Sequence, residues 1–288
     1  MIIWLASYPK SGNTWLRSIL NQILFVDPTT ENIFSDLYKN IPGYPSLMHF
    51  MNLNSSLKNT DDIQKINNII KNWGESQNKI NKEKRLKFFK THNLLTSINL
   101  DGQTFHFTNV KNTLGVIYIV RDPRNIVTSL KNHFFLNSYD EAFEMMTDKK
   151  RWIGTTKDRV PQSLSSWDQH FNSWSFFPKN YILFRYEDLL SDPKKQIIRL
   201  YEYLQKFIKI NFDKQKIDKI ILNSKFLNLK KLESQGYFKE KAINPYTKET
   251  KEFFYLGPRN DYSKILDDKT RYKIEKHFKV TMKKIGYL

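Results

Sequence analysis

The sequence predicts an α/β fold in which a central parallel sheet is covered by helices on both faces, a three-layer sandwich. Two features of the chain point to this fold. Short apolar runs recur along the chain, and helical patterns lie between them. Apolar runs of this length are typical of strands buried on both faces of a parallel sheet. The 288 residues are enough for one large α/β domain or two small ones, and we expect a single domain over residues 1–288.

The predicted elements alternate in chain order. The four predicted strands are Ile2–Ser7, Leu86–Lys90, Leu114–Val120 and Tyr181–Phe184. The predicted helices are Thr14–Phe25, Thr60–Ser76, Arg124–Phe135, Tyr139–Thr147, Leu164–Phe176, Pro193–Phe207 and Asp267–Ile285. The pair Asp192-Pro193 favours a helix start, because aspartate caps a helix and proline suits its first turn.

Two stretches have a less regular pattern, residues 27–60 and residues 234–262. Both are interrupted by proline and glycine, and the first is also rich in asparagine and serine. Long irregular segments inside a compact domain are commonly lids or binding loops. We therefore expect both stretches to close over a site and to help form an acceptor pocket.

The composition narrows the class of protein. Lysine and arginine number 47 against 29 acidic residues, a net charge of +18, which favours an anionic partner such as a nucleotide, a glycan or a nucleic acid. A Lys- and Asn-rich chain can also reflect genomic base composition. With no cysteine, disulfides and thiolate chemistry are excluded. No run reaches the roughly 18 apolar residues of a membrane span, and no signal peptide is visible, so we expect a cytoplasmic protein.

The segment Tyr8–Trp15 is the most informative motif. It lies between the first predicted strand and the first predicted helix, where backbone N–H groups and the positive end of a helix dipole can hold an anion. The Lys10 ammonium and the Ser11 and Thr14 hydroxyls can add to that site. The motif is not a Walker A sequence, because that pattern places a glycine directly before the lysine.

Further candidates follow the other predicted strands. Lys90 and His92 come at the end of the second strand, and Arg121 at the end of the third, where open α/β sheets bind ligands. Histidine titrates near neutrality and can accept a proton from a substrate, whereas the planar arginine fork suits a phosphate. Ser129 lies two helical turns beyond Arg121. A histidine after a strand can also be purely structural.

These motifs together resemble the sulfotransferases that use 3′-phosphoadenosine 5′-phosphosulfate (PAPS). The resemblance implies a fold like that of P-loop kinases, PAPS as co-substrate and no metal. It implies that Lys10, Lys90 and His92 are catalytic, with His92 as the base for a hydroxyl or amine acceptor. The implied donor-binding residues are Lys10, Ser11, Gly12, Asn13, Thr14 and Trp15 in the loop, and Arg121, Ser129, Tyr186, Ser224, Phe226, Gly257 and Arg259 beyond it.

The match departs from the family near the C-terminus. Tyr255 and Leu256 stand where the family has two basic residues, and Arg259 is our candidate replacement. Three alternatives stay open: an ATP-dependent P-loop phosphotransferase, a basic nucleic-acid-binding protein, and a family member that binds nucleotide without catalysis. We expect the sulfotransferase and no nucleic acid. The acceptor is of unknown class, with a slight lean toward an anionic molecule or glycan, and the oligomeric state is not readable from the sequence.

Overall fold

We describe the fold from a computed structural model of the chain. The structure describes residues 1–27, 29–30, 32–42, 63–83, 85–100, 102–153, 162–244 and 247–288. Most of the predicted irregular stretch 27–60 lies outside the described residues.

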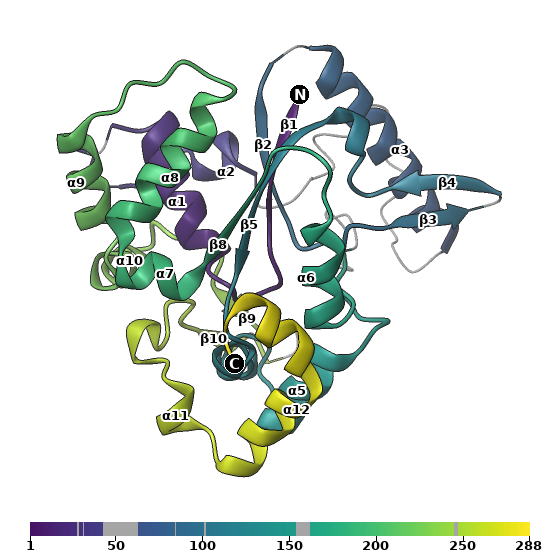
Figure 1. The fold of residues 1–288 in the computed structure, drawn as a ribbon, viewed down its shortest axis with the longest axis vertical. Coiled ribbons are helices and arrows are strands. Elements are labelled where there is room, and N and C mark those ends of the chain that lie inside the picture. Colours follow the sequence, from purple (N-terminus) through teal and green to yellow (C-terminus); the bar gives the residue numbers. More distant parts are fainter. Residues whose placement is uncertain are drawn as a thin grey trace. The chain divides into compact units, whose positions relative to one another are not determined.

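The predicted α/β fold is confirmed, because a four-stranded parallel sheet flanked by helices forms its centre (Figure 1). The strand order is β2-β1-β5-β8, in which β1 is Ile2–Ala6, β2 is Lys87–Thr91, β5 is Thr113–Val120 and β8 is Tyr181–Arg185. β1 pairs in parallel with both β2 and β5. Every residue of β1 is buried, as its continuous apolar sequence predicts.

Each helix that the sequence predicts is also present. These helices are α1 (Asn13–Leu24), α3 (Ile63–Lys82), α4 (Pro123–His133), α5 (Tyr139–Thr147), α6 (Trp167–Ser175), α8 (Pro193–Gln205) and α12 (Asp268–Ile285). Helix α3 runs six residues past its predicted end at Ser76. The Asp192 side chain caps α8 by accepting from the Lys195 N–H, as predicted. Asp122 caps α4 in the same way. Local capping chemistry therefore fixes where these helices begin.

Several short elements were not predicted. The helices among them are α2 (Leu37–Asn40), α7 (Tyr186–Ser191), α9 (Lys214–Asn223), α10 (Phe226–Ser234) and α11 (Tyr262–Ile265). The strands form the hairpins β3–β4 (Ser97–Leu100, Gln103–His106), β6–β7 (Trp152–Ile153, Gln162–Ser163) and β9–β10 (Ala242–Ile243, Thr250–Lys251). Helix α9 buries only Ile217 and Ile220, a face too narrow to give a clear helical pattern.

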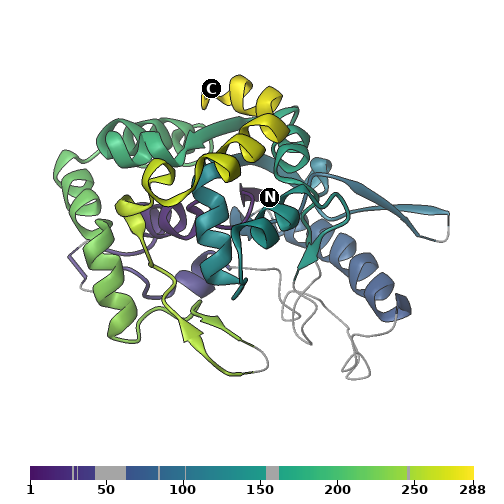
Figure 2. The same cartoon turned by 90° about the horizontal axis from the view of Figure 1, so that it is seen from below.

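The residues group into two compact units. The first holds residues 1–8, 41–118 and 147–183, and the second holds residues 9–40, 119–146 and 184–288. In the first unit Trp4, Trp73 and Phe89 pack on one another with ring centroids 5.7–6.0 Å apart. Helix α3 and the hairpin β3–β4 belong to this unit and contact each other (Figure 2). The single domain expected over residues 1–288 stays a prediction.

The core of the second unit includes an aromatic cluster beside the loop after β1. Its buried members are Ile33, Phe34, Leu37, Leu229, Leu232, Phe238 and Phe254, with Trp15, Phe226 and Phe253 packed against them. The cluster joins α2 and α10 to the stretch 234–262. As expected, that stretch is largely irregular: within its described residues, its regular structure beyond the end of α10 is the short hairpin β9–β10, the 3₁₀ turn Gly257–Arg259 and the first residue of α11.

Candidate active site

The loop between β1 and α1 has the backbone of an anion-binding turn. Lys10 and Gly12 both have positive φ, 64° and 97°, a conformation that a non-glycine residue such as Lys10 adopts only under constraint. Glycine is required at position 12, because a Cβ there would lie 2.6 Å from Cδ2 of Tyr186. No side chain caps α1, and its first turn carries no acidic residue. The helix therefore begins with amide groups suited to an anion.

Three buried donors beside this loop have no hydrogen-bond partner among the described residues: Ser11 Oγ, Trp15 Nε1 and Arg121 Nε. Ser11 is 1% exposed. Buried polar groups are nearly always paired, so unpaired donors at one place indicate a missing acceptor. Arg121 also donates from Nη1 to the Lys10 carbonyl at 3.3 Å, which ties it to the loop. These residues fit a phosphorylated ligand.

Aromatic rings line the same part of the second unit. Trp15 meets Tyr186 edge to face with centroids 5.4 Å apart, and the Arg121 guanidinium lies 4.1 Å from the centroid of the Tyr186 ring. Phe226 packs on the backbone of Gly257, where a Cβ would be 2.3 Å from the ring. The structure thus brings Trp15 and Phe226 to one apolar cluster.

Ser224 is buried just before Phe226, and its hydroxyl accepts a hydrogen bond from Gln22 Nε2 of α1 at 3.1 Å. The hydrogen bond therefore holds the Ser224 hydroxyl against α1, the helix that follows the loop. The hydroxyl keeps its own proton to donate to a further acceptor.

The turn with Gly257 and Arg259 is fixed to α4, the helix that carries Ser129. Thr128 Oγ1 donates to Asn260 Oδ1 at 2.6 Å, and Asn260 Nδ2 donates to the Asn125 carbonyl at 2.8 Å. The side chain of Arg259 is exposed, and that of Ser129 is half-buried. These two hydrogen bonds therefore hold the turn of Gly257 and Arg259, both predicted donor-binding residues, against the helix that carries Ser129.

Arg124, three residues after Arg121, connects α4 to the C-terminal part of the chain. Its guanidinium bonds the Asp122 carboxylate at 2.6 Å, Glu275 of α12 at 2.6 Å and the Tyr287 carbonyl at 2.9 Å. With its donors used in this way, Arg124 joins α4 to the C-terminal helix.

Two carboxylates that the sequence analysis missed form hydrogen bonds around the loop. Glu233 is buried and Glu240 is half-buried. Glu240 accepts from Thr14 Oγ1 at 3.2 Å and pairs with Arg17 Nη2 at 2.5 Å, and the Arg17 side chain is fully buried. Glu233 accepts from the backbone N–H groups of Phe253 and Phe254 at 2.7 and 3.0 Å. No local motif marks either residue, because each partner is distant in sequence.

Phe253 is held by Glu233 so that its ring faces the loop. The Lys10 ammonium lies 3.7 Å from the centroid of that ring, a cation–π contact. The stretch 234–262 therefore contacts the predicted catalytic lysine through Phe253 and the hydroxyl of Thr14 through Glu240. Its closing over a site stays a prediction.

Lys90 and His92 belong to the first unit, at the end of β2, and both are buried. His92 Nδ1 lies 2.6 Å from the Ser7 carbonyl oxygen. A carbonyl can only accept, so Nδ1 carries the ring proton and Nε2 is the basic nitrogen. Of the two neutral tautomers, this one presents Nε2 as the proton acceptor.

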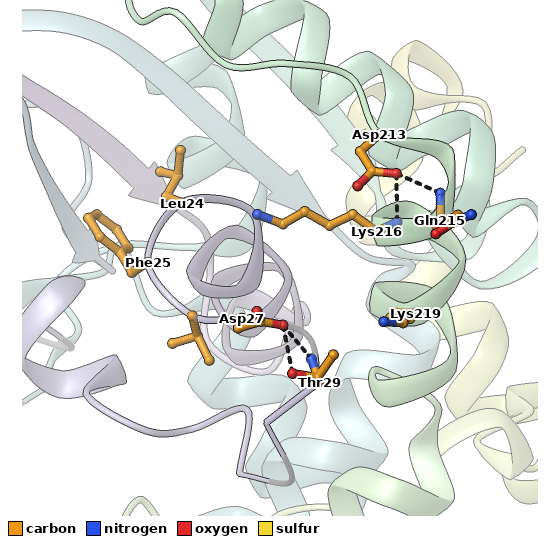
Figure 3. Close-up of a pocket in the computed structure, with 9 residues that line it drawn as sticks. Leu24, Phe25, Asp27, Thr29, Asp213, Gln215, Lys216 and Lys219 are labelled. Atoms are coloured by element: carbon orange, nitrogen blue, oxygen red, sulfur yellow. Dashed lines mark hydrogen bonds between the residues drawn. The ribbon is translucent and has the colours of Figure 1, made fainter.

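A surface pocket of about 430 Å³ lies elsewhere, between the end of α1 and the start of α9 (Figure 3). Three of the four charged residues that line it form hydrogen bonds within the protein: Lys216 Nζ donates to the Ile23 carbonyl, Asp27 accepts from Thr29, and Asp213 caps α9. None of the predicted site residues lines it. We therefore place the candidate site at the loop and not in this pocket.

A metal site and a membrane-spanning helix are both absent from the part of the chain that the structure describes. No group of three or more His, Asp or Glu side chains there could hold a metal ion. Likewise, no helix within the described ranges combines the length and apolar character needed to cross a bilayer.

Comparison with known proteins relates the chain to one family. The sequence model described as "Sulfotransferase domain" matches residues 2–286. Mouse "Sulfotransferase 1E1" is 24% identical over 287 residues, covering 97% of this chain and 82% of the relative, and "Cytosolic sulfotransferase 6" of Arabidopsis thaliana is 25% identical, covering 95% and 76%.

Solved structures share the fold. Mouse sulfotransferase SULT7A1 complexed with PAP aligns with a TM-score of 0.57 at 18% identity, over 97% of this chain and 83% of that one. Retinol dehydratase in a complex with retinol and PAP aligns with a TM-score of 0.60 at 17% identity, over 98% and 81%. These comparisons confirm the predicted fold and the resemblance. The chain belongs to the sulfotransferase family.

Proposed function

We propose that this protein moves the sulfuryl group of PAPS to a hydroxyl or amine acceptor and releases 3′-phosphoadenosine 5′-phosphate (PAP). The observation that carries the proposal is the set of unpaired buried donors, Ser11 Oγ, Trp15 Nε1 and Arg121 Nε, around an uncapped helix start. Family membership supports it, as do structural relatives described as complexes with PAP. Preorganised donors of this kind can stabilise the charge that develops on the leaving phosphate in the transition state.

The loop residues have the electrostatics that the 5′-phosphosulfate requires. The first N–H groups of α1, at Gly12, Asn13 and Thr14, and the hydroxyl of Ser11 suit the oxygens of the phosphate, because they lie at the positive end of the helix dipole. Lys10 supplies the charge that stabilises the bridging oxygen as the bond to sulfur breaks. Positive φ at Lys10 keeps that residue in the turn.

The remaining predicted PAPS-binding residues fall into two groups, one for the 3′-phosphate and one for the adenine ring. Arg121 and Ser129 bind the 3′-phosphate, helped by the turn at Gly257 and by the exposed charge of Arg259, which replaces the basic residues absent at positions 255 and 256. Trp15, Tyr186 and Phe226 hold adenine by stacking, with Ser224 as a polar contact. The shared packing of Trp15 and Phe226 on one cluster supports this division.

His92 acts as the general base. Its Nε2 takes the acceptor proton as the acceptor oxygen or nitrogen bonds to sulfur and the sulfur–oxygen bond to PAP breaks. The hydrogen bond from Nδ1 to the Ser7 carbonyl supports this role, because it places the proton of the neutral ring on Nδ1, leaves Nε2 as the nitrogen that accepts, and stabilises the imidazolium that forms. Lys90, two residues earlier on β2, adds positive charge to the transferring group.

Binding of PAP, measured by calorimetry, tests the donor site. Lys10→Ala is compared with Lys269→Ala, an exposed lysine on α12 that removes the same charge. We expect weaker PAP binding or slower transfer only for Lys10→Ala, with transfer reduced by about 10²–10³-fold. If the protein binds ATP with magnesium and does not bind PAP, the result supports the phosphotransferase alternative and overturns the proposed sulfuryl transfer.

Turnover of labelled PAPS tests catalysis, first with water as acceptor and then with fractionated cell extracts whose products are identified by mass spectrometry. His92→Gln is compared with His106→Gln, an exposed histidine on β4. Loss of about 10²–10⁴-fold in His92→Gln alone is expected for a general base. Tight PAP binding with no turnover in any extract supports the non-catalytic alternative.

The acceptor, location and domain organisation complete the proposal. A net charge of +18 favours an anionic acceptor, although the donor accounts for part of that charge. One relative is named a cytosolic sulfotransferase, which supports a cytoplasmic location. A single sulfotransferase domain over residues 1–288 is supported by the family match to residues 2–286.

A further inference from the structure

A second histidine, His170 of α6, lies behind the segment that carries His92. It is fully buried in the first unit, where Tyr8 packs against its ring edge to face with centroids 5.7 Å apart. His170 Nε2 lies 3.1 Å from the His92 carbonyl oxygen, and His170 Nδ1 lies 2.8 Å from the Tyr118 hydroxyl. The chemistry described so far gives this histidine no role.

The proton positions in this chain follow from the groups involved. The His92 carbonyl can only accept, so His170 carries its proton on Nε2 and donates it there. His170 Nδ1 is then an acceptor, and the Tyr118 hydroxyl of β5 donates to it. Burial lowers the pKa of His170 to about 3, which keeps the ring neutral and preserves this order of donors.

The backbone of His92 is also held on its other side. Its N–H donates to Gln162 Oε1 at 2.7 Å. Both peptide groups that flank the His92 Cα are therefore bound by buried side chains. The next residue is fixed in the same manner, because Trp174 Nε1 of α6 donates to the Asn93 carbonyl at 2.9 Å.

We propose that His170 is a positioning residue for His92: its Nε2–H, oriented by Tyr118, holds the His92 carbonyl so that the imidazole keeps its bond to Ser7. The inference rests on the proposed role of His92 as base. The contact acts on backbone and not on substrate, so the expected effect is on the orientation and tautomer of His92. Donor binding is expected to stay unchanged.

Three variants separate the hydrogen bond from packing. His170→Leu fills much of the space but removes the donor. His170→Gln keeps an amide N–H in the place of Nε2, and Tyr118→Phe removes the hydroxyl that fixes which nitrogen of His170 is protonated. Each is measured by nitrogen-15 NMR of the histidine rings, with His92 assigned from the spectrum of His92→Gln, and by PAPS hydrolysis with water as acceptor.

We expect the wild-type His92 ring to be the Nδ1–H tautomer. In His170→Leu we expect a mixture of tautomers, hydrolysis reduced by about 10²-fold as for a misplaced catalytic group, and unchanged PAP affinity. His170→Gln should restore the single tautomer and most of the rate. Tyr118→Phe should lie between the two.

An unchanged His92 tautomer and rate in His170→Leu overturn the inference. So does a folded His170→Gln that is as slow as the leucine variant, because that result assigns the effect to packing. If His170→Leu does not fold, Tyr118→Phe decides, and an unaltered tautomer and rate there overturn the inference. Full activity in His92→Gln overturns the proposed role of His92 and with it the proposed function. If His92→Gln loses activity and His170→Leu keeps the wild-type tautomer and rate, only the role of His170 is overturned.

Discussion

The substitution Gly257→Ala tests whether the ring of Phe226 belongs to the donor site. A Cβ at position 257 would lie 2.3 Å from Cδ2 and Cε2 of Phe226 and 2.5 Å from Cγ. Carbon atoms in contact need about 3.5–4.0 Å, so the ring must retreat by about 1 Å or more. Because Cγ is among the close atoms, turning the ring about its axis cannot relieve the clash.

Gly236→Ala is the matched control. Gly236 has φ +83°, in the same left-handed region as Gly257 at +54°, but a Cβ there would have nothing within 4 Å. Both substitutions therefore add the left-handed backbone cost of about 1–2 kcal/mol. Only Gly257→Ala adds overpacking, about 1–3 kcal/mol more. Urea unfolding should show this difference between the two variants.

PAP titration of the same two proteins gives the functional result. If Phe226 stacks on adenine, its displacement costs up to the stacking energy of about 1–3 kcal/mol, which weakens PAP binding by about 5- to 150-fold. Gly236→Ala should bind PAP as the wild type does. Equal PAP affinity in both variants, with the extra loss of stability in Gly257→Ala, would refute the assignment of Phe226 to adenine.

Three further predictions follow from charges and backbone. Glu240→Gln should tighten PAP binding, because the Glu240 carboxylate beside the Thr14 hydroxyl repels a phosphate at the start of α1. The same change should lower the free energy of unfolding by about 1–3 kcal/mol, because buried Arg17 loses its ion pair. Weaker PAP binding contradicts the prediction. Gly74→Ala in α3 should raise the free energy of unfolding by about 0.5–1 kcal/mol, because alanine favours a helix over glycine. A Cβ at this position meets nothing within 4 Å, and the backbone needs no positive φ. A loss of stability in thermal unfolding argues against the prediction. His170 has a pKa of about 3 in the folded chain against 6.5 ordinarily, so the unfolded chain binds its proton first and stability falls as pH falls through that window. Between pH 7 and pH 5 the wild type should lose about 2 kcal/mol more than His170→Gln in urea unfolding, and equal losses would contradict the assignment.

The parts of the fold that the sequence predicts well are local. The strands β1, β2, β5 and β8 were predicted within one or two residues, because each contains a short apolar run. β1 is buried throughout, as a strand covered on both faces is. The start of α8 was predicted from the pair Asp192-Pro193, and the structure shows the same arrangement at Asp122-Pro123 before α4. The capping bonds join residues two or three apart. Helices α9 and α10 were not predicted, although they are as long as α5 and α6. They bury two and three residues, against four in each of the other two, and fewer buried residues leave a weaker helical pattern.

For the site, the sequence alone predicted roles for the loop at Lys10, for Arg121 at the end of β5 and for the histidine at the end of β2, and these roles stay predictions. A strand followed by a tight turn and a helix is a local arrangement, so the chain order itself brings the N–H groups, a lysine and two hydroxyls together. The sequence also identified the family, because these motifs keep their residue types and spacing.

Only the tertiary structure decided what surrounds those residues. Thr14 and Glu240 are 226 residues apart, His92 and His170 are 78 apart, and Arg124 and Tyr287 are 163 apart. Each contact depends on how distant segments pack, and the same residue types occur at many positions where they meet only water. A carboxylate or imidazole gains a defined partner and a defined proton once burial removes the solvent that would otherwise satisfy it.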